Sequence, residues 1–296
     1  AGGSGRVASI TGMGYLFLHE SVFSRILRRL VRLLFRVAFS GPDVRVVVQN
    51  SDDLALFRDQ RLARSEILEM IPGSGVECDH FSPYPEATGS ATDEGSARGQ
   101  PEPFRVLLPA RLLWHKGLAE YLGAARILKD QDREIDFLLA GAPDESNPSS
   151  VSESTVSAWE EQGLIEWLGC VEDMPSLYRA VDAVVLPSYR EGLPKVLVEG
   201  AAAALPLVTT DVPGCREVVT DGKDGLLVPA GNPEALAAAI ARLQDDPDLR
   251  RRLGRAARAK ALAQFDAHII IHRFFQIYAD LVTGFAPEPV AGSRPS

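Results

Sequence analysis

The sequence predicts an α/β protein built on doubly wound parallel sheets. Short apolar runs alternate with segments of helical length, most regularly after residue 104, and this alternation is typical of a parallel sheet covered by helices on both faces. The runs are apolar throughout and lack a polar side, as in residues 104–108 and 183–186, which is the pattern of strands buried on both faces.

Composition narrows the class of partner. The 296 residues carry a formal net charge of -9 and 46% hydrophobic residues, so we expect a globular protein with no nucleic-acid partner and a locally positive pocket for any phosphorylated ligand. The three cysteines lack CxxC spacing, which indicates neither a disulfide framework nor a zinc site and favours a reducing compartment. No apolar run approaches the roughly 18 residues of a membrane span.

The first part of the chain predicts a small set of strands and helices. Residues 6–14 predict a strand running into a glycine loop, and because the chain opens in mid-strand without Met we expect missing sequence upstream. Residues 44–49 and 67–71 predict further strands, and residues 50–53 predict the cap of a helix ending near residue 60. Residues 82–103, rich in Pro, Gly and Ser, predict an exposed linker at a domain boundary.

A basic amphipathic helix is predicted at residues 23–37. One face carries arginines at positions 25, 28, 29, 32 and 36, and the other carries Ile26, Leu30, Leu33, Leu34 and Val37. Two interpretations stay open: a surface helix whose apolar stripe faces the core, or a helix that contacts anionic lipid headgroups.

The second part of the chain is more regular. Strands are predicted at residues 104–108, 137–140, 165–168, 183–186, 207–209 and 225–228. Helices are predicted at residues 117–129, 156–162, 174–180, 196–203, 215–219, 233–244, 247–264 and 268–281.

Two glutamates flank a strand-to-helix turn. Glu191 follows the buried run 183–187, a Gly-Leu-Pro turn comes next, and Glu199 lies about two turns into the following helix. Ligands of open α/β sheets bind at the carboxyl ends of the strands, and a helix N-terminus there favours an anion. Carboxylates suit hydroxyl groups rather than anions, so the unit indicates a ligand with both phosphates and hydroxyls, a nucleotide sugar.

A second strand-to-helix loop supplies positive charge. Arg111 and Lys116 lie between the strand at 104–108 and the helix at 117–129. Arginine binds phosphate oxygens as a fork and lysine as a mobile point charge. The alternative interpretation is that both are solvated surface charges. Phosphate binding is favoured over it because the Glu191 turn lies at an equivalent strand end of the same predicted sheet.

Other polar residues at strand ends are weaker candidates. His115 neighbours Lys116, Glu172 and Asp173 follow the strand at 165–168, and Asp211 follows the strand at 207–209. For His115 an incidental loop position is favoured over a catalytic role, and for Glu172 and Asp173 a solvated loop is favoured over contact with a base or ribose. For Asp211 a plain turn and a loop closing over the ligand fit equally well. The dinucleotide, P-loop and GxSxG motifs are absent.

These residues resemble glycosyltransferase family 4, retaining enzymes of the GT-B fold. The motifs are ARLLWHKG at 110–117, EGLPKVLVE at 191–199, TTDVPGCREVV at 209–219 and DGLLVP at 224–229, and the resemblance covers about residues 6–284. TGMGYLF at 11–17 and the arginine-rich helix resemble the branch that builds capsule, O-antigen and similar surface glycans. That branch implies a UDP-sugar donor, often N-acetylated, a polyprenyl-diphosphate-linked acceptor, and a cytoplasmic protein peripheral to the inner face of the membrane.

The resemblance assigns roles to individual residues. It implies that Arg111 and Lys116 hold the donor diphosphate and stabilise its departing charge, that Glu191 contacts the sugar hydroxyls, and that Glu199 binds the ribose. It further implies that the turn of Gly192, Leu193 and Pro194 presents backbone N–H groups to sugar and phosphate. No metal or other cofactor is expected.

The resemblance also sets the expected domains. Residues 1–81 are expected to be the last part of an N-terminal, acceptor-side domain, 82–103 a linker, 104–266 the donor-binding Rossmann-like domain, and 267–296 a helix crossing back to the first domain, followed by a tail. The start of the N-terminal domain, with its histidine near the reaction centre, is expected to be missing, which should leave apolar surface exposed. A truncated nucleotide-sugar-binding fragment and, further off, a UDP-sugar epimerase are the alternatives.

Overall fold

The computed structural model describes residues 5–12, 22–41, 43–83, 103–144 and 146–282, with side chains from residue 29 onward in the second of these ranges. The chain divides into two compact units, one of residues 1–75 with 267–296 and one of residues 76–266. Residues 76–81, expected in the first domain, cluster with the second unit, because the N–H of Val76 donates to the carbonyl of Phe265 at 3.0 Å. Most of the predicted linker lies outside the described residues.

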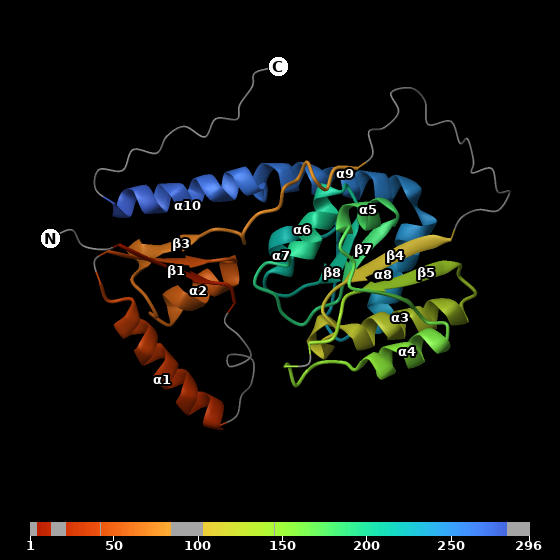
Figure 1. Ribbon diagram of the computed structural model, residues 1–296, viewed down its shortest axis with the longest axis horizontal. Coiled ribbons are helices and arrows are strands. Elements are labelled where there is room, and N and C mark those ends of the chain that lie inside the picture. The colour runs from red at the N-terminus through yellow and green to blue at the C-terminus, as the bar shows by residue number, and fades with distance from the viewer. Residues whose placement is uncertain (1–4, 13–21, 42, 84–102, 145, 283–296) are drawn as a thin grey trace, which may run out of the picture. The chain divides into compact units, whose positions relative to one another are not determined.

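The first unit contains a three-stranded parallel sheet in the order β1-β2-β3 (Figure 1). The strands are β1 (Arg6–Ile10), β2 (Val44–Val48) and β3 (Leu68–Met70). Helix α1 (Val22–Ala38) joins β1 to β2; α2 (Ser51–Asp59) and a short 3-10 turn (Ser65–Ile67) join β2 to β3. As predicted, Asn50 caps α2, its side-chain oxygen accepting from the N–H of Asp53 at 2.7 Å.

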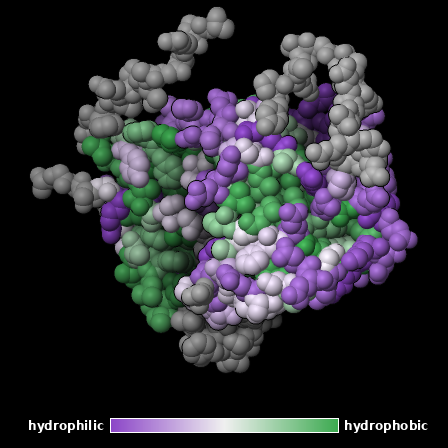
Figure 2. All heavy atoms as spheres, turned by 45° about the vertical axis from the view of Figure 1, so that its right-hand side comes forward, coloured by the Kyte–Doolittle hydropathy of each residue, from purple (hydrophilic) through white to green (hydrophobic). Residues whose placement is uncertain are grey.

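Helix α1 packs against its unit through a different face from the apolar stripe that the sequence predicted. The rings of Phe35 and Phe39 stack at 5.4 Å, and Phe35 lies 5.7 Å from Phe57 of α2. Four residues of the predicted core-facing stripe are instead 52–66% exposed: Leu30, Leu33, Leu34 and Val37. The core interpretation is therefore wrong for these four residues: positions 35 and 39, one helical turn apart, face the core and rotate the leucines outward. Figure 2 shows hydrophobic (green) surface on this unit.

Helix α10 (Ala267–Leu281) packs on the same sheet. Its Ile270 and Ile277 form a small buried cluster with Val47 of β2 and Ile71. On its outer side Ile271, Phe275 and Tyr278 remain 43–48% exposed.

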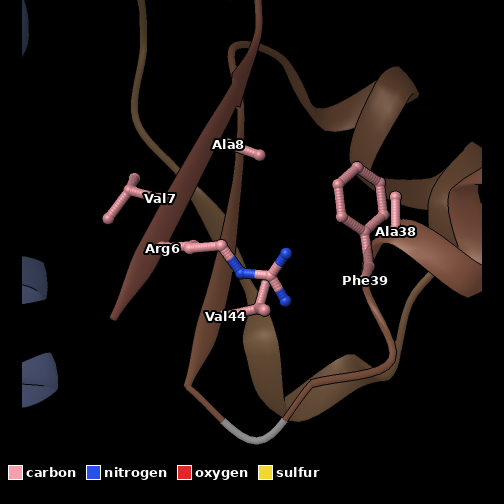
Figure 3. A pocket seen from close by; sticks show the side chains of 6 residues that line it. All are labelled: Arg6, Val7, Ala8, Ala38, Phe39 and Val44. Carbon is pink, nitrogen blue, oxygen red and sulfur yellow. The ribbon is translucent and has the colours of Figure 1, made fainter. Parts of the chain in front are cut away.

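The first unit also holds a hollow of about 400 Å³ beside β1 (Figure 3). Its lining consists of Arg6, Val7, Ala8, Ala38, Phe39 and Val44. None of the residues predicted to bind the donor lines it.

The second unit is built on a six-stranded sheet in the order β6-β5-β4-β7-β8-β9, with every neighbouring pair parallel. The strands are β4 (Phe104–Pro109), β5 (Ile135–Ala140), β6 (Glu166–Gly169), β7 (Ala183–Leu186), β8 (Leu207–Thr210) and β9 (Leu226–Val228). The chain runs outward from β4 to β6 and then returns to place β7 on the other side of β4. This reversal is the switch point of a doubly wound sheet, where ligands bind outside the carboxyl ends of the strands.

Helices cover both faces of this sheet, which confirms the predicted fold class. Helix α3 packs against α8 and α6 against α9, and Figure 1 shows α3 and α4 on one side of the strands with α6 and α9 on the other. The helices are α3 (Leu118–Asp130), α4 (Glu153–Glu161), α5 (Met174–Arg179), α6 (Lys195–Ala202), α7 (Cys215–Val218), α8 (Pro233–Asp245) and α9 (Pro247–Gln264), with a 3-10 turn at Trp114–Lys116. Strand residues such as Val106 and Val184 are fully buried.

Candidate functional site: the carboxyl ends of β4 and β7

The loops that follow β4 and β7 are bonded to each other at the switch point. The carbonyl of His115 accepts the N–H of Tyr189 at 3.0 Å and lies 3.1 Å from the hydroxyl of Ser188. Gly117 has φ 80°, and a Cβ there would overlap the carbonyl of Pro187, so only glycine lets the loops approach this closely. The structure thereby brings the two sequence-predicted clusters together.

The centre of the site is an ion pair between Lys116 and Glu191. Lys116 Nζ lies 2.6 Å from Glu191 Oε1, and the side chains are 17% and 10% exposed. The hydroxyl of Ser188, itself fully buried, lies 2.6 Å from the same oxygen. Glu191 is therefore fixed by a cation and a hydroxyl on one oxygen, which makes it a preorganised acceptor.

Arg111 lies in the same loop but points to solvent. Its side chain is 63% exposed, and Nη1 is 2.8 Å from Oδ2 of Asp144, which follows β5. The carboxylate orients the arginine at the mouth of the sheet while leaving much of the fork accessible to an anion.

The predicted turn 192–194 leads directly into α6, whose first residue is Lys195. The loop after β8 lies against this turn: Glu191 N–H donates to the carbonyl of Pro213 at 3.2 Å. Gly214 has φ 82°, and a Cβ on it would lie 2.6 Å from the carbonyl oxygens of Glu191 and Gly192. Glycine at 214 is thus required both by its backbone conformation and by the space available.

Glu199 is a buried carboxylate, 7% exposed. Its Oε2 accepts from Tyr178 Oη at 3.0 Å, and Lys195 Nζ lies 3.5 Å from Oε1. Burial raises the pKa of Glu199, while the bonds from Tyr178 and Lys195 lower it in part. Burial, with Glu199 as the second cause, raises the pKa of Tyr178 well above its usual range, so this hydroxyl stays a donor.

The weaker candidates take structural positions. Asp173 caps α5, accepting from the N–H of Ser176 at 3.1 Å, and hydrogen bonds from Ser176 lower its pKa. Asp211 pairs with Arg216 at 3.0 Å. Burial and the neighbouring Lys116 charge lower the pKa of His115, which favours its neutral form. Glu172 is exposed.

Two contacts of the site escaped sequence reasoning. Ser188 precedes Glu191 by three residues, a spacing that a turn could have suggested. Tyr178 comes from a helix 21 residues before Glu199, and no local pattern signals that approach. Lys195, by contrast, is four residues from Glu199 on one helix, a spacing that predicts contact.

Among the residues that the structure describes, no group of three or more His, Cys, Asp and Glu side chains could hold a metal ion. The same described residues contain no helix long and apolar enough to cross a membrane.

Comparison with known proteins decides the family. Residues 92–260, over half of the chain, match the family model described as glycosyl transferases group 1. The chain belongs to this family. It is therefore a glycosyltransferase by descent, as the sequence motifs predicted.

Two curated relatives illustrate the match. An N,N'-diacetylbacillosaminyl-diphospho-undecaprenol alpha-1,3-N-acetylgalactosaminyltransferase of Campylobacter jejuni is 30% identical over 92% of this chain and 70% of its own length. The capsular polysaccharide biosynthesis glycosyltransferase CapM of Staphylococcus aureus is 27% identical over 59% of this chain and 46% of its own. The chain thus spans from about half to 70% of the length of these relatives.

Solved structures confirm the fold. The crystal structure of Anabaena Alr3699/HepE in complex with UDP superimposes with a TM-score of 0.74 at 21% identity, over 93% of this chain and 72% of the other. Sucrose-phosphate synthase from Thermosynechococcus elongatus gives 0.74 at 24% identity, over 94% and 68%. The parallel α/β architecture is that of GT-B glycosyltransferases.

Proposed function

We propose that the chain binds a UDP-sugar at the carboxyl ends of β4 and β7, for transfer of the sugar to a lipid-linked or oligosaccharide acceptor in bacterial surface-glycan synthesis. The observation that carries the proposal is the cluster of Lys116, Ser188 and Glu191 at the switch point, with Glu199 on the helix that follows. The cations suit the phosphates of a nucleotide sugar, and the carboxylates suit its sugar and ribose hydroxyls.

Each group has a part in binding the donor. Arg111 and Lys116 hold the diphosphate, Glu191 accepts hydrogen bonds from sugar hydroxyls, and Glu199 accepts from the ribose. In the turn of Gly192, Leu193 and Pro194, the backbone N–H groups of the first two residues face sugar and phosphate, together with those at the start of α6. Pro194 has no N–H to donate. The geometry of the site supports these parts, since Ser188 already orients the Glu191 carboxylate and a helix N-terminus favours an anion.

The chemistry needs stabilisation of a departing diphosphate. As the bond between the anomeric carbon and the phosphate oxygen breaks, negative charge grows on the UDP leaving group. Lys116 and Arg111 stabilise that charge from fixed positions, and preorganised charge of this kind is usually the largest contribution to a rate enhancement. The side chains present supply this without a metal ion, and we propose that the transfer retains the anomeric configuration.

Lys116 then interacts with two anionic groups, the Glu191 carboxylate and the donor diphosphate. Its Nζ contacts Glu191 at 2.6 Å, and a bound diphosphate would compete for the same ammonium. An ammonium group has three donors, so it can bridge the carboxylate and a phosphate oxygen, which couples the sugar-binding residue to the leaving group.

The relatives favour particular substrates. The Campylobacter jejuni relative is named for transfer of N-acetylgalactosamine to a diphospho-undecaprenol-linked sugar, and the Staphylococcus aureus relative for capsular polysaccharide. We propose an N-acetylhexosamine or hexose as the transferred sugar and a polyprenyl-diphosphate-linked acceptor.

Helix α1 is proposed to contact the inner face of the cytoplasmic membrane. Five arginines and no acidic residue lie within 22–38 of a chain with net charge -9, and four large apolar side chains beside them are more than half exposed. Exposed leucines flanked by arginines suit an anionic lipid surface. This would place the protein beside a lipid-linked acceptor.

Flotation with anionic vesicles tests the membrane contact. The variant Leu30→Ser/Leu33→Ser/Leu34→Ser should lose most of its vesicle binding, because it removes exposed apolar surface without touching the core. Leu262→Ser on α9, where the leucine is 41% exposed, is the matched control and should float like the parent chain. Equal flotation of both variants would contradict the proposal.

A transfer assay distinguishes an active enzyme from a fragment that only binds the donor. That alternative stays open because the chain spans only part of the length of its relatives. Radiolabelled UDP-N-acetylgalactosamine, UDP-N-acetylglucosamine or UDP-glucose is incubated with a polyprenyl-diphosphate sugar in vesicles. Labelled lipid product that is lost in Glu191→Ala and kept in Glu161→Ala, an exposed position on α4, supports the enzyme. UDP binding without labelled product supports the fragment.

A further inference from the structure

A further carboxylate, that of Glu120, lies next to the candidate site and has no part in the proposed donor contacts. Glu120 is in the first turn of α3, yet only 8% of its surface is exposed. The hydroxyl of Tyr189 donates to its Oε1 at 2.5 Å, and this hydrogen bond is the main cause that raises the pKa of Tyr189 to about 12. Tyr189 itself is 44% exposed.

The bond is important for the carboxylate. Oε2 of Glu120 is buried and has no hydrogen-bond partner among the described residues, so the hydroxyl of Tyr189 is the donor that offsets its burial. A buried carboxylate that loses its donor is strongly unfavourable. The two side chains therefore hold each other in one arrangement.

The bond also fixes the segment that carries Glu191. Tyr189 stands between Ser188, whose hydroxyl bonds Glu191, and the turn that Glu191 opens. Its N–H bonds the carbonyl of His115, next to Lys116. The backbone bond and the side-chain bond tie this segment at two points to the loop and helix that follow β4.

The loop after β9 lies near the Tyr189 hydroxyl. Gly231 has φ 71°, and a Cβ there would lie 3.8 Å from the Tyr189 hydroxyl. The 231 loop therefore lies beside the hydroxyl, while Tyr189 as a whole stays partly exposed.

We propose that Tyr189 and Glu120 are a positioning pair that holds the Glu191 carboxylate at the place where the donor sugar binds. The inference rests on the proposed function, since it assumes that Glu191 meets the sugar. It predicts a division between ligands: the pair affects the sugar contact of Glu191 and leaves the nucleotide contacts of Glu199 unchanged.

Calorimetry with UDP and with UDP-sugars measures that division. Tyr189→Phe should weaken binding of the UDP-sugar preferred by the parent chain about tenfold, the loss expected for one misplaced hydrogen bond. Its affinity for UDP should stay within about twofold of the parent, a change too small to signify a lost bond. Tyr278→Phe, an exposed tyrosine on α10, is the matched control and should change neither affinity.

Variants of the partner test whether the bond itself matters. Glu120→Gln keeps a carbonyl oxygen for the Tyr189 hydroxyl and should bind the UDP-sugar like the parent chain. Glu120→Ala should reproduce the loss seen in Tyr189→Phe, and the double variant should lose no more than either single variant, because one bond is removed in all three.

The outcomes separate the two claims. Equal loss for UDP and UDP-sugar, or lowered thermal stability with unchanged affinities, shows a purely structural pair and overturns the inference. A parent chain that binds UDP but no UDP-sugar, or neither, overturns the sugar role of Glu191 in the proposed function and the inference with it.

Discussion

Replacement of Glu199 by alanine should weaken UDP binding without unfolding the second unit. Glu199 is 7% exposed, and its carboxylate receives bonds from Tyr178 and Lys195. After the substitution Tyr178 Oη keeps a partner, the carbonyl of Val196 at 3.1 Å. The variant also loses a carboxylate whose burial raises its pKa, so the penalty for burying its charge disappears with it.

The expected loss of affinity follows from the ribose contact. A hydrogen bond to a charged group contributes about 1.5–3 kcal/mol, and each 1.4 kcal/mol is a factor of ten in the dissociation constant. One lost contact of this kind therefore predicts roughly a 10- to 150-fold weaker affinity for UDP.

Titration calorimetry with UDP is the assay, with thermal melting of each variant to establish that it is folded. Glu161→Ala, exposed on α4, is the matched control and should bind like the parent chain. A folded Glu199→Ala protein whose UDP affinity equals that of the parent would refute the ribose role, since UDP binding would then not depend on the Glu199 carboxylate.

Three further results are expected. Affinity for a UDP-sugar should fall on acidification at a pH above 4.5, because the ribose needs ionised Glu199 and burial raises the pKa of this carboxyl above that ordinary value. A pH titration of the affinity checks this. Glu199→Gln should abolish the transition. The same shift means that the folded state holds the proton more tightly, so this group's contribution to stability falls as pH rises through its raised pKa. Lys116→Ala should lower the free energy of unfolding by about 3–5 kcal/mol, since it leaves Glu191 buried without its cation; urea titration measures it, and a loss below 1 kcal/mol would show the pair to be solvated. Gly214→Ala should lower the melting temperature more than Gly222→Ala. Both glycines have positive φ, but only a Cβ at position 214 would lie 2.6 Å from carbonyl oxygens. Equal melting temperatures of the two variants would contradict this close approach.

The order and type of the elements could be predicted because local pattern decides them. Strands such as β7 are continuous apolar runs, and the predicted cap at Asn50 is a local hydrogen bond. The orientation of α1 could not, because its apolar residues are numerous enough to define two stripes and only packing against Phe57 selects the one that faces the core.

The candidate site was predictable in its charges and less so in its connections. The strand ends place Lys116 and Glu191 at adjacent mouths of the sheet, so their pairing follows from topology. The bonds of Tyr178 to Glu199 and of Tyr189 to Glu120 join residues 21 and 69 positions apart. Such contacts depend on how helices settle on the sheet, which short-range pattern does not encode.

A crystal structure of the chain with a bound UDP-sugar would show directly whether the donor binds at the carboxyl ends of β4 and β7. We expect the diphosphate between Arg111 and Lys116, the sugar hydroxyls on Glu191 and the ribose on Glu199. A nucleotide sugar bound away from the carboxyl ends of β4 and β7, or bound there with its ribose remote from Glu199, would contradict it.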